Sequence, residues 1–167
     1  MHKSNRIAKS AKINSDLIIG KNNVICDNVF FYGKTIIGDG NYIGAGCVFN
    51  NKVEIGNKNT FIGNCSIGSQ GEMGLQGDRI PDNGKVLIGD SNMFREFITV
   101  NFPVFESLTL IKNSCYFMAR THLPHDVIVN NSVTMATNSL IGGHCIVDDY
   151  AYIGLGSMTH QKINSSI

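Results

Sequence analysis

Four histidines in the last third of the sequence are the side chains best suited to chemistry: His122, His125, His144 and His160. An imidazole titrates near pH 6.5, so around neutrality it can accept a proton, bind a substrate or ligate a metal. Such a site needs several of these groups in one place. Whether the four histidines meet depends on the fold that carries them.

A hydrophobic residue recurs at every sixth position from Ile7 to Ile67. A period of six fits neither an α-helix, at about 3.6 residues per turn, nor a strand, at about two. It indicates a short repeat whose backbone returns to the same orientation. The register breaks twice and resumes each time. The sequence therefore predicts one all-β domain over residues 1–167, with loop insertions near 71–87 and 101–110.

Asparagines reveal a second, longer period. Asn23, Asn41 and Asn59 are 18 residues apart and occupy the same place in their hexads, and Asn92 has that place after the first break. Three hexads therefore form one turn of a three-sided coil. If Asn92 belongs to the same column, the first insertion returns the chain to the side on which the repeat would have continued.

The coil predicts where the histidines lie. Counted from the inward residue of each hexad, His125, His144 and His160 all have outward positions in hexads one turn apart. Successive turns of a parallel coil stack at about 4.8 Å, so we expect a stripe of imidazoles on one face, with His122 at the corner just before it. Both insertions leave from this face and would wall a cleft. The alternative is that surface histidines fall together by chance.

Composition argues against several classes of protein. The net charge of +1 and the scattered Lys and Arg give no basic surface for nucleic acid. No apolar run approaches the roughly 20 residues that cross a bilayer, and the N-terminus lacks the apolar stretch of a signal peptide, so we expect a cytoplasmic protein without a membrane span. Cysteines 47, 65, 115 and 145 all have the small inward position of their hexads, which predicts core packing and no disulfide or metal site.

Short motifs in the C-terminal part and around Arg95 carry a family resemblance. They read His-Leu-Pro-His-Asp at 122–126, Gly-His at 143–144, Val-Asp-Asp-Tyr at 147–150, His-Gln at 160–161 and Phe-Arg-Glu-Phe-Ile-Thr-Val at 94–100. With the hexad period, they resemble the hexapeptide-repeat acyltransferases, and among these the UDP-N-acetylglucosamine O-acyltransferases of lipid A synthesis. The resemblance implies that the coil is a left-handed parallel β-helix.

The resemblance also implies an activity. It is the transfer of an acyl group from the thioester of an acyl carrier protein or coenzyme A to a sugar nucleotide, in a cleft between subunits of a homotrimer, without a metal or a tightly bound cofactor. His125 would be the general base, Asp126 would orient it, and the backbone N–H of Gly143 would stabilise the oxyanion. The substrate would be held by His122, His144, His160 and Gln161.

The chain departs from the family pattern at two places. Where the family has Gln-Asp-x-Lys at the start of the first insertion, Gln70 and Glu72 are the nearest polar substitutes, followed by Gln76 and Asp78. Asn101 stands where the family has a histidine. We expect Gln70, Glu72 and Asn101 to contribute to substrate binding, and we expect the first insertion to bind the acceptor.

Three other functions stay open. Since the sequence ends before the later coils and the helical C-terminal domain of the family, one is a short-chain N-acyltransferase acting on a nucleotide-linked amino sugar. The second is a catalytically inactive trimeric paralogue. The third is a zinc enzyme like the γ-type carbonic anhydrases, although His122 and His125 lack the ligand spacing of that family. The sequence does not specify the acceptor sugar, the acyl length, or the choice between O- and N-acylation.

Overall fold

The computed structural model describes residues 2–13, 16–72, 80–162 and 164–165, and the regular structure in these ranges consists of short β-strands. The strands form three parallel sheets, which we call faces A, B and C. Face A contains β1 (Arg6–Ile7), β4 (Val24–Ile25), β7 (Tyr42–Ile43), β10 (Thr60–Phe61), β13 (Met93–Phe94), β16 (Tyr116–Phe117), β19 (Thr134–Met135) and β21 (Tyr152–Ile153). Face B contains β2 (Lys12–Ile13), β5 (Phe30–Phe31), β8 (Val48–Phe49), β11 (Ser66–Ser69), β14 (Thr99–Asn101) and β17 (His122–Leu123). Face C contains β3 (Leu17–Ile19), β6 (Thr35–Ile37), β9 (Val53–Ile55), β12 (Lys85–Ile88), β15 (Leu108–Ile111), β18 (Ile128–Val129), β20 (Ile146–Val147) and β22 (Asn164–Ser165).

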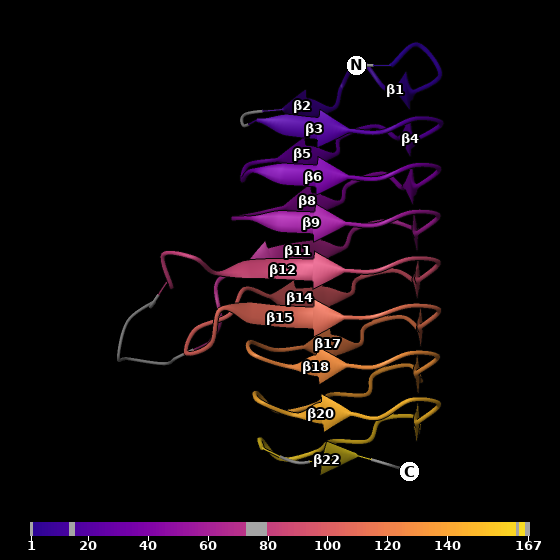
Figure 1. Cartoon of the computed structure of the whole chain (residues 1–167). Helices are drawn as coiled ribbons and strands as arrows, with labels where there is room; N and C mark the ends of the chain where they lie inside the picture. The colour runs from indigo at the N-terminus through magenta and orange to yellow at the C-terminus, as the bar shows by residue number, and fades with distance from the viewer. Residues whose placement is uncertain (1, 14–15, 73–79, 163, 166–167) are drawn as a thin grey trace.

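The chain visits the three faces in turn and pairs each strand with its equivalent one coil later. Ile7 pairs with Ile25 and Ile25 with Ile43, which is the 18-residue period expected from the sequence. In Figure 1 the face C strands run to the right in front and the chain returns behind them while it descends from the N-terminus, so the coil is left-handed. The predicted left-handed parallel β-helix is confirmed. Within the described residues no helix is long and apolar enough to cross a membrane.

The core lies inside the coil and is built from the recurring hydrophobic residue of each hexad. Phe61 stacks on Phe94 with ring centroids 4.5 Å apart, and Phe94 stacks on Phe117 at 4.9 Å. All three rings are fully buried. Cysteines 47, 65, 115 and 145 are buried, as the small inward position predicts, and none of the four is in a disulfide. The six-residue period therefore encodes the side-chain layers of one continuous core.

The asparagine column holds neighbouring coils together at one corner. The backbone N–H and the side-chain amide of Asn41 both donate to Oδ1 of Asn23, at 2.8 and 3.1 Å. Asn92 bonds in the same way to Asn59, at 2.9 and 3.0 Å. The prediction that Asn92 continues the column is confirmed, so the phase of the coil survives the first insertion.

The two insertions lie at the same corner of consecutive coils. Ile67 pairs with Val100, 33 residues later instead of 18, and Ile88 pairs with Ile111, 23 residues later. Fifteen and five residues are therefore added, and the described parts of both segments project from one side of the coil (Figure 1).

The insertions are shorter than the predicted ranges of 71–87 and 101–110. The strands that flank them take up the difference, because β12 begins at Lys85, β14 includes Asn101, and β15 begins at Leu108. The two insertions thus extend over residues 70–84 and 102–107. Gln76 and Asp78, predicted as polar substitutes, lie outside the described residues.

Candidate active site

The candidate site lies at the corner between faces B and C on three successive coils. Each coil places one residue of this corner in the left-handed backbone region, namely Asp126 (φ 60°), His144 (φ 60°) and Lys162 (φ 61°). The N–H of His144 donates to the carbonyl of His125 at 3.3 Å, and that of Lys162 to the carbonyl of Gly143 at 3.0 Å. Two columns of side chains result: His125, Gly143 and Gln161 form the first, and Asp126, His144 and Lys162 the second.

His125 and Asp126 form a hydrogen-bonded pair at the base of these columns. Nδ1 of His125 lies 2.8 Å from Oδ2 of Asp126. An ionised carboxylate can only accept, so the bond requires the proton on Nδ1 and leaves Nε2 of a neutral imidazole as the acceptor. The His125 side chain is 12% exposed and the Asp126 side chain is fully buried. This is the arrangement of an oriented base.

The Asp126 carboxylate also holds the second insertion. It accepts hydrogen bonds at 3.0 Å from the backbone N–H of residues 104, 105 and 106. Burial by itself would raise the pKa of Asp126, but the N–H of Phe105, the imidazole of His125 and the other two N–H groups outweigh it. The pKa of Asp126 is therefore lowered, and the carboxylate is ionised at neutral pH.

Two glycines leave room for the His125 ring. A Cβ added to Gly143 would stand 2.7 Å from Cε1 and 3.0 Å from Nε2 of His125, and one added to Gly71 would stand 3.0 Å from its Cβ. These separations are shorter than ordinary carbon contacts, so a side chain at position 143 would displace the imidazole, and one at position 71 would press on His125 and, more closely, on Cγ2 of Val104. Gly71 belongs to the first insertion and Gly143 to the next coil. The ring is held between them.

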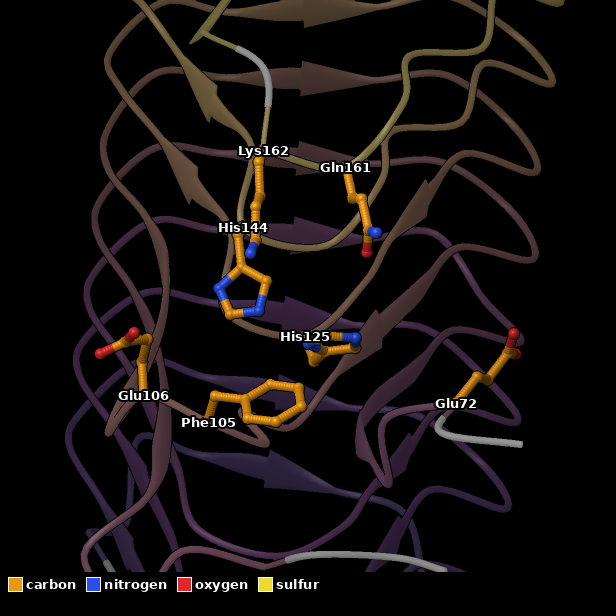
Figure 2. Close-up of a pocket in the computed structure, with 7 residues that line it drawn as sticks. All are labelled: Glu72, Phe105, Glu106, His125, His144, Gln161 and Lys162. Carbon is orange, nitrogen blue, oxygen red and sulfur yellow. The ribbon is translucent and has the colours of Figure 1, made fainter. Parts of the chain in front are cut away.

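Aromatic contacts complete the site. The rings of His125 and His144 meet edge to face with centroids 5.4 Å apart. The ring of Phe105 lies 5.9 Å from that of His125 and 5.4 Å from that of His144. Figure 2 shows Phe105 beneath both imidazoles. The pocket, of about 600 Å³, is lined by Glu72, Phe105, Glu106, His125, His144, Gln161 and Lys162.

His122 and His160, both expected to bind substrate, lie outside this lining. Nδ1 of His122 is 2.6 Å from Oγ1 of Thr99 on the neighbouring strand. Burial lowers the pKa of His122, against the raising effect of the Glu72 charge. His160 is exposed, with Nδ1 3.4 Å from the carbonyl of Gln161. It stands above Gly142, outside both columns, so the structure brings together His125 and His144 and not a stripe of three imidazoles.

Gln70 is the first residue of the first insertion and Asn101 is the last residue of β14, and neither lines the pocket. The amide of the buried Asn101 donates to the carbonyl of Gln70 at 2.9 Å. The N–H of Phe102 donates to the carbonyl of Ser69 at 2.7 Å. These bonds link the two insertions at the points where they leave the coil. Glu72, two residues beyond Gln70, does line the pocket.

The same corner contains a set of potential metal ligands. One ligand atom from each of His125, Asp126 and His144 lies within 4.8 Å of the others. The Asp126 oxygens, however, already accept three backbone N–H groups and the His125 imidazole. A metal on Asp126 would displace donors that hold the second insertion. The cluster is better described as a hydrogen-bond network than as a metal centre.

Phe105, Glu106 and Lys162 line the pocket without having been identified from the sequence. Lys162 lies 18 residues after His144, so the coil period was a sufficient signal for it. Phe105 and Glu106 lie in an insertion, where no period applies. Their position depends on Asp126, and no local pattern contains that contact.

No family model matches the chain. The chain is 37% identical over 81 residues to the acyl-[acyl-carrier-protein]–UDP-N-acetylglucosamine O-acyltransferase of Albidiferax ferrireducens, and 38% identical over 79 residues to that of Stenotrophomonas maltophilia. These matches cover 47% and 46% of this chain, but only 31% and 30% of the two relatives. The matched part is thus less than a third of the length of those proteins.

Solved structures are similar over nearly the whole chain. The UDP-N-acetylglucosamine acyltransferase from Campylobacter jejuni has a TM-score of 0.69 at 22% identity, over 95% of this chain and 66% of that one. The enzyme from Bacteroides fragilis has a TM-score of 0.59 at 26% identity, with the same coverage of both chains. The resemblance expected from the motifs is confirmed in sequence and in fold.

Proposed function

We propose that this chain is an acyltransferase that moves an acyl group from a thioester to a sugar nucleotide such as UDP-N-acetylglucosamine, with His125 as the general base. The observation that carries the proposal is the bond between His125 and Asp126, 2.8 Å long, at the wall of a pocket. The similarity to enzymes named for this reaction, with an acyl carrier protein as donor, supports it. The reaction would be the first acyl transfer of lipid A synthesis.

The proposed mechanism assigns one role to each group. Nε2 of His125 accepts the proton of the acceptor hydroxyl as its oxygen attacks the thioester carbonyl carbon. The Asp126 carboxylate orients the imidazole and stabilises its charged form. The N–H of Gly143 donates to the tetrahedral oxyanion. The carbon–sulfur bond then breaks and the imidazolium returns the proton to the leaving thiolate, so no tightly bound cofactor is required.

The pocket and its surroundings would hold the acceptor. The Lys162 ammonium suits an anionic phosphate, and the Gln161 amide and the His144 imidazole suit sugar hydroxyls. The predicted substrate roles of His122, His160, Gln70 and Asn101 remain proposals. The hydrogen bond between Asn101 and Gln70 favours a structural role for both residues, at the points where the two insertions begin, over direct contact with the substrate.

We propose that the chain assembles as a homotrimer with clefts between subunits. Face C supports this, because the outward positions of its coils from β12 to β20 form an apolar strip of Leu87, Leu110, Ile128 and Ile146, all half-buried and paired in that order. A solvated outer face would instead alternate with polar residues. The strip adjoins the site, since Ile128 and Ile146 line a depression together with Asp126 and His144.

Two carboxylates favour a second candidate, an N-acyltransferase acting on a nucleotide-linked amino sugar with a short acyl-coenzyme A donor. Glu72 and Glu106 line the pocket with His125, and Lys162 is the cation among its lining residues. Two negative charges attract the ammonium group of an amino sugar, a group that UDP-N-acetylglucosamine lacks. This candidate uses the same base and the same proton path.

One experiment tests the proposed function and separates the candidates. The purified protein and its His125→Ala variant are incubated with UDP-N-acetylglucosamine or a nucleotide-linked amino sugar, each with acyl carrier protein or coenzyme A thioesters, and the products are weighed by mass spectrometry. We expect an acylated acceptor with the wild type and a loss of product with the variant. Donor or acceptor binding without product from any pair would instead indicate the inactive paralogue.

A further inference from the structure

The second insertion is anchored on both sides of one exposed aromatic residue. The N–H groups of residues 104–106 all donate to the Asp126 carboxylate at 3.0 Å, and Phe102 and Val104 are buried. Phe105 itself is 49% exposed. Three consecutive N–H groups on one buried carboxylate fix the backbone at residues 104–106. The Phe105 ring is therefore held at one place.

That place is against both imidazoles of the site. The Phe105 centroid lies 5.9 Å from that of His125 and 5.4 Å from that of His144. These separations are within the range in which aromatic rings attract each other beyond simple burial. In Figure 2 the ring lies on the side of the imidazoles away from Gln161 and Lys162. The Phe105 ring thus packs against both imidazoles from one side, and we call this contact the floor of the histidine pair.

His144 depends on this floor more than His125 does. The His125 ring has its Asp126 bond and two flanking glycines, whereas the described residues offer the His144 imidazole no hydrogen bond within 3.5 Å. Nε2 of His144 lies 3.7 Å from Oδ2 of Asp126, the oxygen that His125 uses. A shift of less than about 1 Å would bring it within hydrogen-bond distance. The two imidazoles are thus potential competitors for one oxygen.

We propose that Phe105 is a positioning residue, which fixes the imidazoles of His125 and His144 and keeps His144 from taking the carboxylate oxygen that orients His125. Asp126 then has two tasks, because the same carboxylate orients His125 and places the ring that protects this orientation. The catalytic part of the inference rests on the proposed function. The packing part stands on the contacts alone.

Accessibility of the histidines tests the packing part. Diethyl pyrocarbonate modifies neutral imidazoles at a rate that depends on their exposure, and peptide mass spectrometry reads His125 and His144 separately. We expect faster modification of both in Phe105→Ala and wild-type rates in Phe105→Tyr, which keeps the ring. Phe97→Ala is the matched control, since Phe97 is 55% exposed and lies between β13 and β14, at a different corner of the coil. Wild-type rates at both histidines in Phe105→Ala would overturn the proposal.

Kinetics test the catalytic part. We expect Phe105→Ala to lower kcat about 10²-fold with little change in KM, because the base is misplaced by a fraction of an ångström to one ångström. Phe105→Tyr should restore turnover. A wild-type kcat in Phe105→Ala would contradict the role. If the wild type turns over no acceptor, the proposed function has failed on its own, and the modification rates still decide whether Phe105 holds the histidines.

Hydrogen exchange tests the anchoring. In Asp126→Asn the amides of residues 104–106 face a side chain that accepts at one atom only, so they should exchange faster than in the wild type. The amide of Ile128, bonded to the carbonyl of Cys145 at 3.0 Å, serves as an internal reference. Unchanged exchange at all three amides would contradict the anchoring.

If Phe105→Ala fails to fold, Phe105→Leu replaces it, because leucine keeps most of the apolar volume but has no aromatic ring. The expected changes in histidine modification rate and in kcat have the same direction as for Phe105→Ala.

Discussion

Gly143 lies directly against the imidazole of His125, although the two residues are 18 positions apart and belong to different coils. The first consequence concerns substitution. In Gly143→Ala the new methyl would stand 2.7 Å from Cε1 of His125 and push the ring away from its place. We expect kcat to fall about 10²-fold. Steady-state kinetics check this, with Gly154→Ala as the control, because its Cβ would approach only a serine hydroxyl at 3.2 Å. Equal turnover in the two variants would contradict the geometry.

His125→Ala should lower kcat by about 10²–10⁴, the usual contribution of a general base. The ring lies outside the coil, so its removal opens no cavity in the core, and the unfolding midpoint in denaturant should change little. Kinetics and denaturation on the same preparation measure both effects. If the variant keeps more than half of the wild-type kcat, the general base must be a group other than His125.

Acid should unfold the protein partly through Asp126. Its pKa is lower in the folded chain than the ordinary value of about 3.9, so its contribution to stability is present above that value and is lost as the pH falls through the folded pKa. Urea unfolding of wild type and Asp126→Asn at a series of pH values from 7 to 3 gives the free energy of unfolding of each protein as a function of pH. The two curves should converge toward low pH. If they stay parallel, ionisation of Asp126 does not contribute to the stability of the folded chain.

His122 should make the free energy of unfolding depend on pH in a second, higher range, between pH 7 and pH 5. Burial lowers the pKa of His122 below its ordinary value of about 6.5, so the unfolded chain binds more protons than the folded chain just below that pH. Stability from this group is complete above about pH 6.5 and is lost as the pH falls. In His122→Gln the loss of unfolding free energy between pH 7 and pH 5 should be smaller than in the wild type. The same slope in both would exclude His122 as its source.

The assembly can be tested on face C. Leu110→Glu puts a charge on the apolar strip and should convert the expected trimer to monomers, which light scattering after size-exclusion chromatography detects. Thr134→Glu is the control, because Thr134 has an outward position on face A. A wild-type monomer at micromolar concentration would remove the proposed trimer, and with it the cleft between subunits.

The sequence predicted the coil well because each hexad repeats one physical requirement. Inward positions such as Phe61, Phe94 and Phe117 must be apolar, and the position of Asn41 must supply an amide to the next coil. These requirements recur at every turn, so a count along the chain recovers them. The ends of the two insertions were less well predicted because the flanking strands gain pairs through contacts with neighbouring coils.

The residues of the candidate site could be predicted from the sequence only where they recur every 18 residues at the corner between faces B and C. His125 and His144 follow from outward positions at the same corner, and Lys162 follows from the same count. His160 differs, because one step along the hexad turns it out of the columns. Phe105 depends on a carboxylate that is 21 residues away in the chain, and no pattern in the sequence records that contact.

The two insertions add fifteen and five residues to consecutive coils, yet the coils above and below them keep the same pairing. Closing a flexible loop costs entropy that grows only with the logarithm of its length, so the longer insertion costs about 1 kcal/mol more than the shorter one. Segments at this corner can therefore change in length during evolution at almost constant stability. The repeating coil acts as a fixed frame that keeps His125 and His144 in place, while the segments that bring Glu72, Phe105 and Glu106 to the pocket are free to diverge.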